Sequence, residues 1–242
     1  MKKIPIGTFI YEFKCDPVLL SQVYEDISTS NKIIWAPKMP PSELKNVDTA
    51  TLNTLPLMGY MDKEREVSYY HPTLFNWFDD CISKVVADSI PNTALTINET
   101  WLNKFKFGQH HSTPHYHRLS VYSGLLYLTT HSGSSFTNFF PQNDAVKIMN
   151  NYLNFGNNFE SNKIPKDTFL SEPLAGKLLI FPSNLMHSIS THTDIKNLRY
   201  TLAFNTFWEG TVGHTTSTLN IKVKSVKETY EEFMKNQTAF VK

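Results

Sequence analysis

The chain has 242 residues and a formal net charge of +1, and 40% of its residues are hydrophobic and 13% aromatic. This length suits one large domain or two small ones, with enough apolar material for a β-rich core. The nearly balanced charge argues against a global field that would attract nucleic acid or an anionic membrane. Neither is therefore expected as a partner.

The sequence predicts a cytoplasmic protein. The two cysteines, Cys15 and Cys81, do not make a disulfide framework, and a reducing compartment fits them best. Two lysines lie near the start of the chain, but no long apolar run follows them, so we expect no signal peptide. No segment approaches the roughly 18 apolar residues of a membrane span.

The first part of the chain predicts one strand, one helix and an irregular segment. Residues 5–13 alternate weakly and indicate an opening strand. Asp16 and Pro17 are typical of a helix cap followed by proline at the first helical position, which predicts a helix to about Ser28. Residues 36–58 contain four prolines and indicate irregular wrapping.

The clearest predicted helix spans residues 71–90. Pro72 suits its first turn, and apolar residues recur at helical spacing along one face. We expect this face to support a sheet. It comprises Leu74, Trp77, Phe78, Cys81, Ile82, Val85 and Val86.

From about residue 95 the apolar period changes to 2, which predicts strands. In the first, a long strand, one alternating set is Leu95, Ile97, Glu99, Trp101, Asn103 and Phe105. Further strands are predicted at 119–130, 134–140, 176–182, 186–191, 198–208 and 217–224. Many short strands separated by turn signals favour an antiparallel sandwich or barrel, so the fold class is mainly β with flanking helices.

We divide the chain into three parts of one domain. Residues 1–94 form a helical and irregular buttress, residues 95–224 form the β core, and residues 225–242 form a tail that could end in a short helix. The long insertion 142–168 holds seven asparagines. It predicts either a mobile cover over the functional site or a surface excursion, with a short amphipathic helix near 148–153.

Histidines and one arginine carry the chemical signal. His115 and His117 are two residues apart, so in extended chain their imidazoles point to the same side. His187 follows an apolar strand and a short turn, and it could complete a metal site with them. Arg199 opens the next apolar run, where its planar guanidinium could hold the carboxylate of a co-substrate bound to that metal. An oxygen-activating iron enzyme is the leading hypothesis, and a surface arginine paired with Asp194 is the simpler alternative for Arg199.

Four motifs occur in order along the chain. They are His115-Tyr-His117, Ser123-Gly-Leu-Leu-Tyr-Leu128, Gly176-Lys-Leu-Leu-Ile-Phe-Pro-Ser-Asn-Leu-Met-His187 and Arg199-Tyr-Thr-Leu-Ala-Phe-Asn205. Together they make the stretch 101–208 resemble the Fe(II)/2-oxoglutarate-dependent dioxygenases. The resemblance is greatest to prolyl-hydroxylase-like oxygenases of bacteria and phages, which would place a phage-encoded chain in the host cytoplasm. It implies a double-stranded β-helix core, also called a jelly roll, of cupin-like architecture.

The resemblance also implies residue roles. His115 and His187 match the two histidine ligands of Fe(II), and Arg199 matches the arginine that pairs with the distal carboxylate of 2-oxoglutarate. Thr201 matches a hydroxyl that assists this arginine, and Tyr127 lies where some members place a tyrosine toward the same carboxylate. The implied co-substrates are 2-oxoglutarate and O2, with release of succinate and CO2. The implied reaction is hydroxylation of a protein side chain or a small molecule.

One position departs from the family's usual pattern. The usual iron site has two histidines and one carboxylate, but His117 occupies the carboxylate position, and residues 100–143 contain no Asp or Glu. We favour three histidine ligands, His115, His117 and His187. Alternatively, two histidines bind with a water, or a distant carboxylate joins them. The distant candidates are Asp144, Glu172 and Asp194.

Two other classes of protein remain open. A cupin-type metal protein without 2-oxoglutarate would suit three histidines, but it leaves Arg199 and Thr201 unexplained. A non-catalytic β-sandwich binding module would make the histidines incidental.

Overall fold

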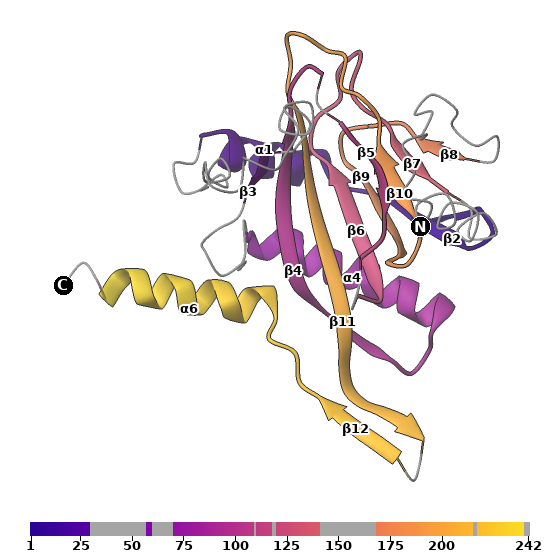
Figure 1. The fold of residues 1–242 in the computed structure, drawn as a ribbon. Helices are drawn as coiled ribbons and strands as arrows, with labels where there is room; N and C mark the ends of the chain where they lie inside the picture. The colour runs from indigo at the N-terminus through magenta and orange to yellow at the C-terminus, as the bar shows by residue number, and fades with distance from the viewer. Residues whose placement is uncertain are drawn as a thin grey trace, which may run out of the picture.

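The computed structural model describes residues 1–29, 57–59, 70–108, 110–117, 120–140, 168–214 and 217–239. Two antiparallel sheets and three helices make up this part of the chain (Figure 1). The strands are β1 (Lys2–Pro5), β2 (Phe9–Lys14), β3 (Leu57–Gly59), β4 (Ala94–Phe105), β5 (His111–His115), β6 (Tyr122–Tyr127), β7 (Thr137–Phe139), β8 (Phe169–Ser171), β9 (Lys177–Pro182), β10 (His187–Ile189), β11 (Arg199–His214) and β12 (Ser217–Ile221). The helices are α1 (Pro17–Thr29), α4 (Pro72–Ser89) and α6 (Val226–Ala239).

The two sheets face each other and enclose an apolar interior. The major sheet has the order β1-β2-β9-β6-β11-β4-β3, with β12 paired to β11, and the minor sheet has the order β5-β10-β7-β8. Phe139 of the minor sheet packs against Phe181 of the major sheet with ring centroids 4.9 Å apart. The Tyr127 hydroxyl donates a 2.6 Å hydrogen bond across the interior to the Thr137 hydroxyl. These side chains line the space between the two sheets, which is the interior of the fold.

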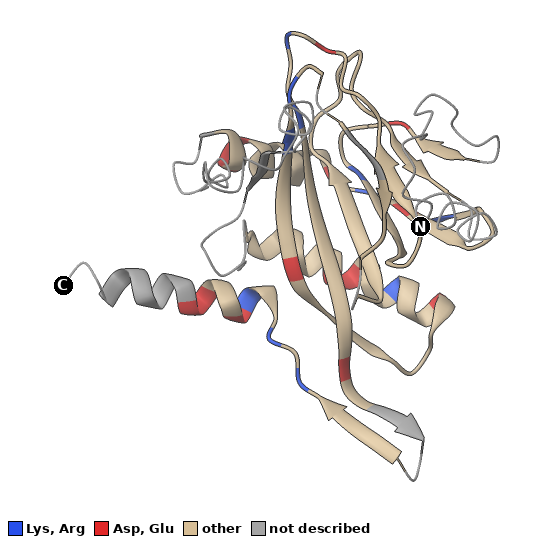
Figure 2. Ribbon diagram, in the orientation of Figure 1, with Lys and Arg blue, Asp and Glu red and all other residues tan. Residues whose placement is uncertain are grey.

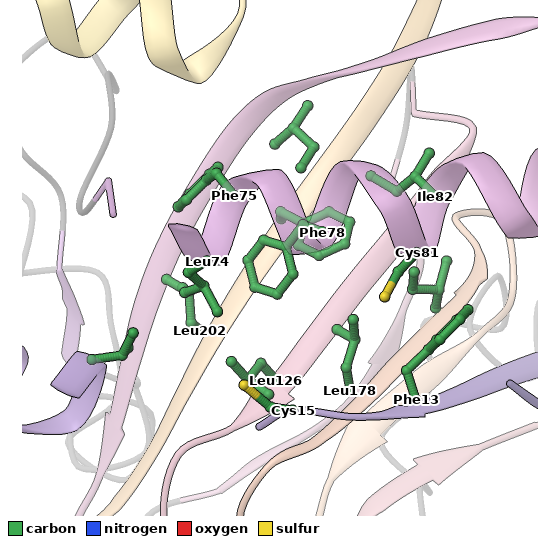
Figure 3. Close-up of a cluster of buried hydrophobic side chains, with 14 of the residues drawn as sticks. Phe13, Cys15, Leu74, Phe75, Phe78, Cys81, Ile82, Leu126, Leu178 and Leu202 are labelled. Atoms are coloured by element: carbon green, nitrogen blue, oxygen red, sulfur yellow. The ribbon is translucent and has the colours of Figure 1, made fainter. Parts of the chain in front are cut away.

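Helices α1 and α4 cover the opposite face of the major sheet (Figure 1). Alternate strand residues such as Leu126, Leu178 and Leu202 point to this side and pack against the apolar face of α4, as Figure 3 shows. Period-2 strands therefore bury both faces of the central sheet, one against helices and one against the second sheet.

The predicted helices are confirmed, and their caps explain where they begin. The Asp16 carboxylate accepts hydrogen bonds of 2.9 and 3.1 Å from the backbone N–H groups of Val18 and Leu19. His71 caps α4 by accepting from the backbone N–H of Leu74, ahead of proline in the first turn. The expected apolar face of α4 is buried, apart from Trp77, which is only half-buried. Phe75, which was not expected on this face, is buried as well.

Several strand predictions need correction. The single opening strand at 5–13 is wrong, because Gly7 with φ +80° turns the chain between β1 and β2. Strand β5 was not predicted, and its Pro114 is tolerated because β5 is the edge strand of the minor sheet. The short strands β3 and β8 were missed, because three residues are too few to show a period.

A bulge breaks the predicted alternation in β4. Asn205 pairs with Glu99, but the next residue of β11, Thr206, pairs with Ile97, so Asn98 is the extra residue. Beyond the bulge the two faces exchange. Ile97 therefore packs on the helix side of the sheet, and not in the interior with Trp101 as the alternation predicts.

Gly124 in the Ser-Gly-Leu-Leu-Tyr-Leu motif permits close packing against a neighbouring strand. It lies opposite Phe204 on the neighbouring strand, and a Cβ atom at Gly124 would come within 2.0 Å of the Phe204 ring. Phe204 is fully buried and packs on Phe78 of α4 at 4.8 Å between ring centroids. A side chain at this position would therefore push the sheet away from α4.

The C-terminal part of the structure consists of β12, which pairs with the end of β11, and α6, whose first turn packs on the core through Val226 (Figure 1). Ser225 and Glu228 form a reciprocal capping box at the start of α6. Among the described residues, no helix is long and apolar enough to cross a membrane. The predicted cover and helix within 142–168 lie outside the described residues, apart from Thr168, and the three-part division of the chain stays a prediction.

Candidate metal centre

Three imidazoles meet at one end of the interior. His115 and His187 lie directly opposite each other in the β5–β10 pairing, and His117 follows two residues after His115. Their ring centroids are 4.3 Å (His115–His187), 5.0 Å (His117–His187) and 5.5 Å (His115–His117) apart. One ligand nitrogen from each can be chosen so that all three lie within 4.8 Å of one another. The three predicted ligands therefore converge, and this geometry fits a metal ion.

The surroundings of His187 fix which nitrogen faces that point. His187 is buried, and its Nδ1 lies 2.9 Å from the carbonyl oxygen of Leu185. A carbonyl can only accept, so Nδ1 carries the proton and Nε2 keeps its lone pair for a metal. Phe181 and Phe139 pack against the His187 ring at 5.1 and 6.0 Å and keep water from this side.

His117 is held by a polar row that crosses three strands. Its Nδ1 lies 2.7 Å from Oδ1 of Asn205 and 2.9 Å from the Ser123 hydroxyl. Asn205 in turn donates through Nδ2 a 2.9 Å hydrogen bond to the Glu99 carboxylate. Burial lowers the pKa of His117, while Asn205 and Glu99 oppose that shift. The neutral imidazole, which is the form that binds metal, is thus favoured.

Arg199 is a fully buried cation that lies between aromatic rings. It has no solvent exposure, and none of its guanidinium nitrogens has a hydrogen-bond partner among the described residues. Its guanidinium carbon lies 5.1 and 5.3 Å from the ring centroids of Phe105 and Tyr127. Burial lowers the pKa of Arg199, and Tyr127 partly opposes this shift. An isolated buried guanidinium needs an anion, so this site fits a carboxylate ligand.

Further polar residues adjoin Tyr127, the aromatic neighbour of the guanidinium. Thr201 pairs with Tyr127 across β11 and β6, and its hydroxyl accepts a hydrogen bond from Asn103. Ser171 pairs with Thr137, the partner of the Tyr127 hydroxyl, and its own hydroxyl has no partner among the described residues. The Tyr127 ring therefore lies beside the guanidinium, and Thr201 lies two residues after Arg199 on the same face of β11.

The alternatives for the third ligand and for Arg199 find no support in the described part of the chain. Glu172 is exposed, and Asp194 accepts hydrogen bonds from the backbone of Lys196 and Asn197. The pairing of Arg199 with Asp194 is therefore wrong. Among the described residues, the three histidines are the group that could hold a metal, and Asp144 lies outside those residues.

Sequence reasoning missed the roles of Glu99 and Asn205. Both were visible, Glu99 in the alternating set of β4 and Asn205 at the end of the arginine motif. What brings them to His117 is the register, because Glu99, Asn205 and Ser123 form one cross-strand row. Alternation gives the face of each residue but no pairing partner.

Comparisons with known proteins agree with this site. Residues 99–205, somewhat less than half of the chain, match a family described as "Putative 2OG-Fe(II) oxygenase". HygX from Streptomyces hygroscopicus, solved with nickel and 2-oxoglutarate bound, is 12% identical with a TM-score of 0.52, over 83% of this chain and 82% of HygX. The non-heme alpha ketoglutarate dependent carbocyclase SnoK from nogalamycin biosynthesis is 9% identical with a TM-score of 0.53, over 83% of this chain and 79% of SnoK. No curated protein matches the chain in sequence.

The fold agrees with the class of protein that the sequence resembles. Two facing antiparallel sheets with three converging histidines at one end form a double-stranded β-helix core, as the sequence predicts. Residues 99–205 match the 2OG-Fe(II) oxygenase family, which confirms the resemblance over that stretch. The family's name specifies Fe(II) and 2-oxoglutarate, and the three histidines and the buried Arg199 fit these two groups.

Proposed function

We propose that His115, His117 and His187 hold Fe(II), and that Arg199 binds the distal carboxylate of 2-oxoglutarate with help from Thr201 and Tyr127. The orphaned guanidinium is the observation that carries this proposal. A cupin-type protein without 2-oxoglutarate, or a binding module, would gain nothing from a fully buried arginine that lacks any partner in the described structure.

The protein's own part in the reaction is to bind, orient and exclude water. When bound, iron and 2-oxoglutarate supply the oxidising chemistry, with release of succinate and CO2. The Leu185 carbonyl and the Asn205 amide fix the orientation of the two imidazoles they contact. Tyr127 and Phe105 enclose the guanidinium, which strengthens its attraction for a carboxylate because little water competes there.

For the reaction itself, we propose hydroxylation of a protein side chain or of a small molecule. This outcome requires only that a C–H bond be held beside the iron. His115 and His117 are half-buried and Tyr116 between them is exposed, so the histidine end of the interior meets the surface. A substrate would reach the iron from this side. With two free, buried cysteines, a cytoplasmic location is part of the same proposal, in the host cytoplasm if the chain is phage-encoded.

An anaerobic titration tests the proposal. Fe(II) followed by 2-oxoglutarate should give a weak visible charge-transfer band in the wild-type protein. His187→Ala should lose metal, and Arg199→Ala should retain metal but lose the band at 2-oxoglutarate concentrations that saturate the wild type. Metal binding without a band would favour the cupin alternative, and no metal binding would favour the binding module.

A further inference from the structure

We propose that Glu99, acting through Asn205, sets the tautomer of His117 and so directs its Nε2 to the metal. This inference rests on the proposed function, because it takes His117 as a ligand. Neither Glu99 nor Asn205 is a candidate ligand itself. Each acts on the ligand through hydrogen bonds, which makes them positioning residues.

The side-chain amide of Asn205 can face His117 in two ways. In the observed orientation Oδ1 faces Nδ1 of His117 at 2.7 Å and Nδ2 faces the Glu99 carboxylate at 2.9 Å. The reversed orientation would place the amide oxygen against a carboxylate, with two acceptors in contact. Glu99 therefore selects the observed orientation.

The selected amide then selects the proton position on His117. An amide oxygen accepts only, so a contact of 2.7 Å requires a proton on Nδ1. Ser123 supports the same arrangement, because its hydroxyl donates a 2.8 Å hydrogen bond to the same oxygen. With Nδ1 protonated, the neutral imidazole leaves the lone pair of Nε2 free for coordination.

The backbone of His117 is fixed as well. Its N–H donates a 2.8 Å hydrogen bond to the carbonyl oxygen of Ser183. The Ser183 hydroxyl lies 2.8 Å from the Ser123 hydroxyl, so the same buried serines hold both the main chain and the ring. The ring position is therefore set by packing and backbone, and Glu99 governs the tautomer in particular.

A matched control lies on the same two strands. Glu99 and Glu209 are the single acidic residues of β4 and β11, and each strand shows one acidic segment in Figure 2. Both are half-buried, but Glu209 contacts Thr96 and not the histidines. Glu209→Gln therefore controls for the loss of a half-buried carboxylate from this strand pair.

The first experiment needs no metal. In ¹⁵N-labelled metal-free protein, the ring-nitrogen shifts of His117 should show Nδ1–H in the wild type and in Glu209→Gln. Glu99→Ala should shift His117 to the other tautomer or to a mixture. The double variant Glu99→Gln/Asn205→Asp exchanges the carboxylate and the amide. Its glutamine donates to the new carboxylate, which accepts from His117, so this variant should restore Nδ1–H. An unchanged Nδ1–H signal in folded Glu99→Ala overturns the inference.

The second experiment uses Co(II) as the probe, followed by its visible absorption. Removing a group that orients a ligand histidine weakens metal binding by about 10–100-fold. We expect this loss in Glu99→Ala, wild-type affinity in Glu209→Gln, and recovery to within about threefold in the double variant. If Glu99→Ala binds Co(II) like the wild type while His117→Ala does not, the inference fails and the proposed ligand set stands. If His117→Ala binds like the wild type, the ligand set itself is wrong.

Discussion

Arg199→Met should stabilise the ligand-free protein and abolish its response to 2-oxoglutarate. Without a ligand the guanidinium has given up water and has no hydrogen-bond partner among the described residues. Each buried polar group left unsatisfied costs about 1–3 kcal/mol, and more when it is charged. Methionine has a similar unbranched stem but no donors, so replacing the cation removes this cost.

The expected change in the free energy of unfolding follows from the contacts that the variant loses and keeps. In the wild type, cation–π contacts with the two aromatic rings beside the guanidinium offset about 0.5–2 kcal/mol of this cost, and the variant loses them. The net gain is therefore about 1–3 kcal/mol, which in a chain of this size raises Tm by about 2–12 °C. In the wild type, 2-oxoglutarate at 100 times its Kd should add about 2.7 kcal/mol of stability. The variant should show none of this increment.

Calorimetry of the Co(II)-loaded and metal-free proteins, each with and without 2-oxoglutarate, measures both effects. Arg199→Lys is the control, because it keeps a charge but loses the planar fork, and it should keep a weakened response to 2-oxoglutarate. A fall in Tm of several degrees in metal-free, ligand-free Arg199→Met would refute the reasoning. It would mean that the guanidinium is satisfied in the resting protein.

Two further predictions concern the core. Gly124→Ala should destabilise the protein by about 1–3 kcal/mol, because its methyl group would overlap the buried ring of Phe204; urea unfolding measures this, and an unchanged midpoint would contradict it. Burial raises the pKa of Cys15 to about 11 and that of Cys81 to about 12, so at pH 8 both thiols should react with a disulfide reagent only as fast as the protein opens. Because both values lie above those of the unfolded chain, the associated stability is present below about pH 9 and is lost as the pH rises through 11 to 12; rapid labelling of the native protein at pH 8 would contradict this burial.

The predictable parts of the fold are those that depend on residue patterns within one short segment of the chain. The helix α4 has eighteen residues of regular spacing and a capped start, so its sequence alone indicates it. The convergence of the three histidines was predictable because His115 and His117 share a face of the chain and because His187 follows a strand and a turn. These signals require no knowledge of which strands pair.

What could not be predicted depends on pairing between distant strands. The bulge at Asn98 moves Ile97 and Leu95 to the helix side of the sheet. The bulge is a feature of the pairing between β4 and β11, so the sequence of β4 alone does not show it. The contact between Asn205 and His117 likewise joins residues far apart in the chain. A sequence shows the alternation of each strand but not the register that sets these partners.

Register also explains why a histidine can stand where related sites use a carboxylate. Under the proposed ligand set, three neutral imidazoles bring one negative charge fewer than two histidines and a carboxylate. Glu99 supplies a negative charge beyond the ligands, and Asn205 connects it to His117 by hydrogen bonds. His117→Asp should therefore bind Co(II) more weakly than the wild type, since its carboxylate would face Oδ1 of Asn205 and the field of Glu99. His117→Asp/Glu99→Gln should bind more tightly than His117→Asp, because the Asn205 amide can then turn and donate to the new carboxylate. Equal Co(II) affinities for these two variants would show that Glu99 does not govern this position.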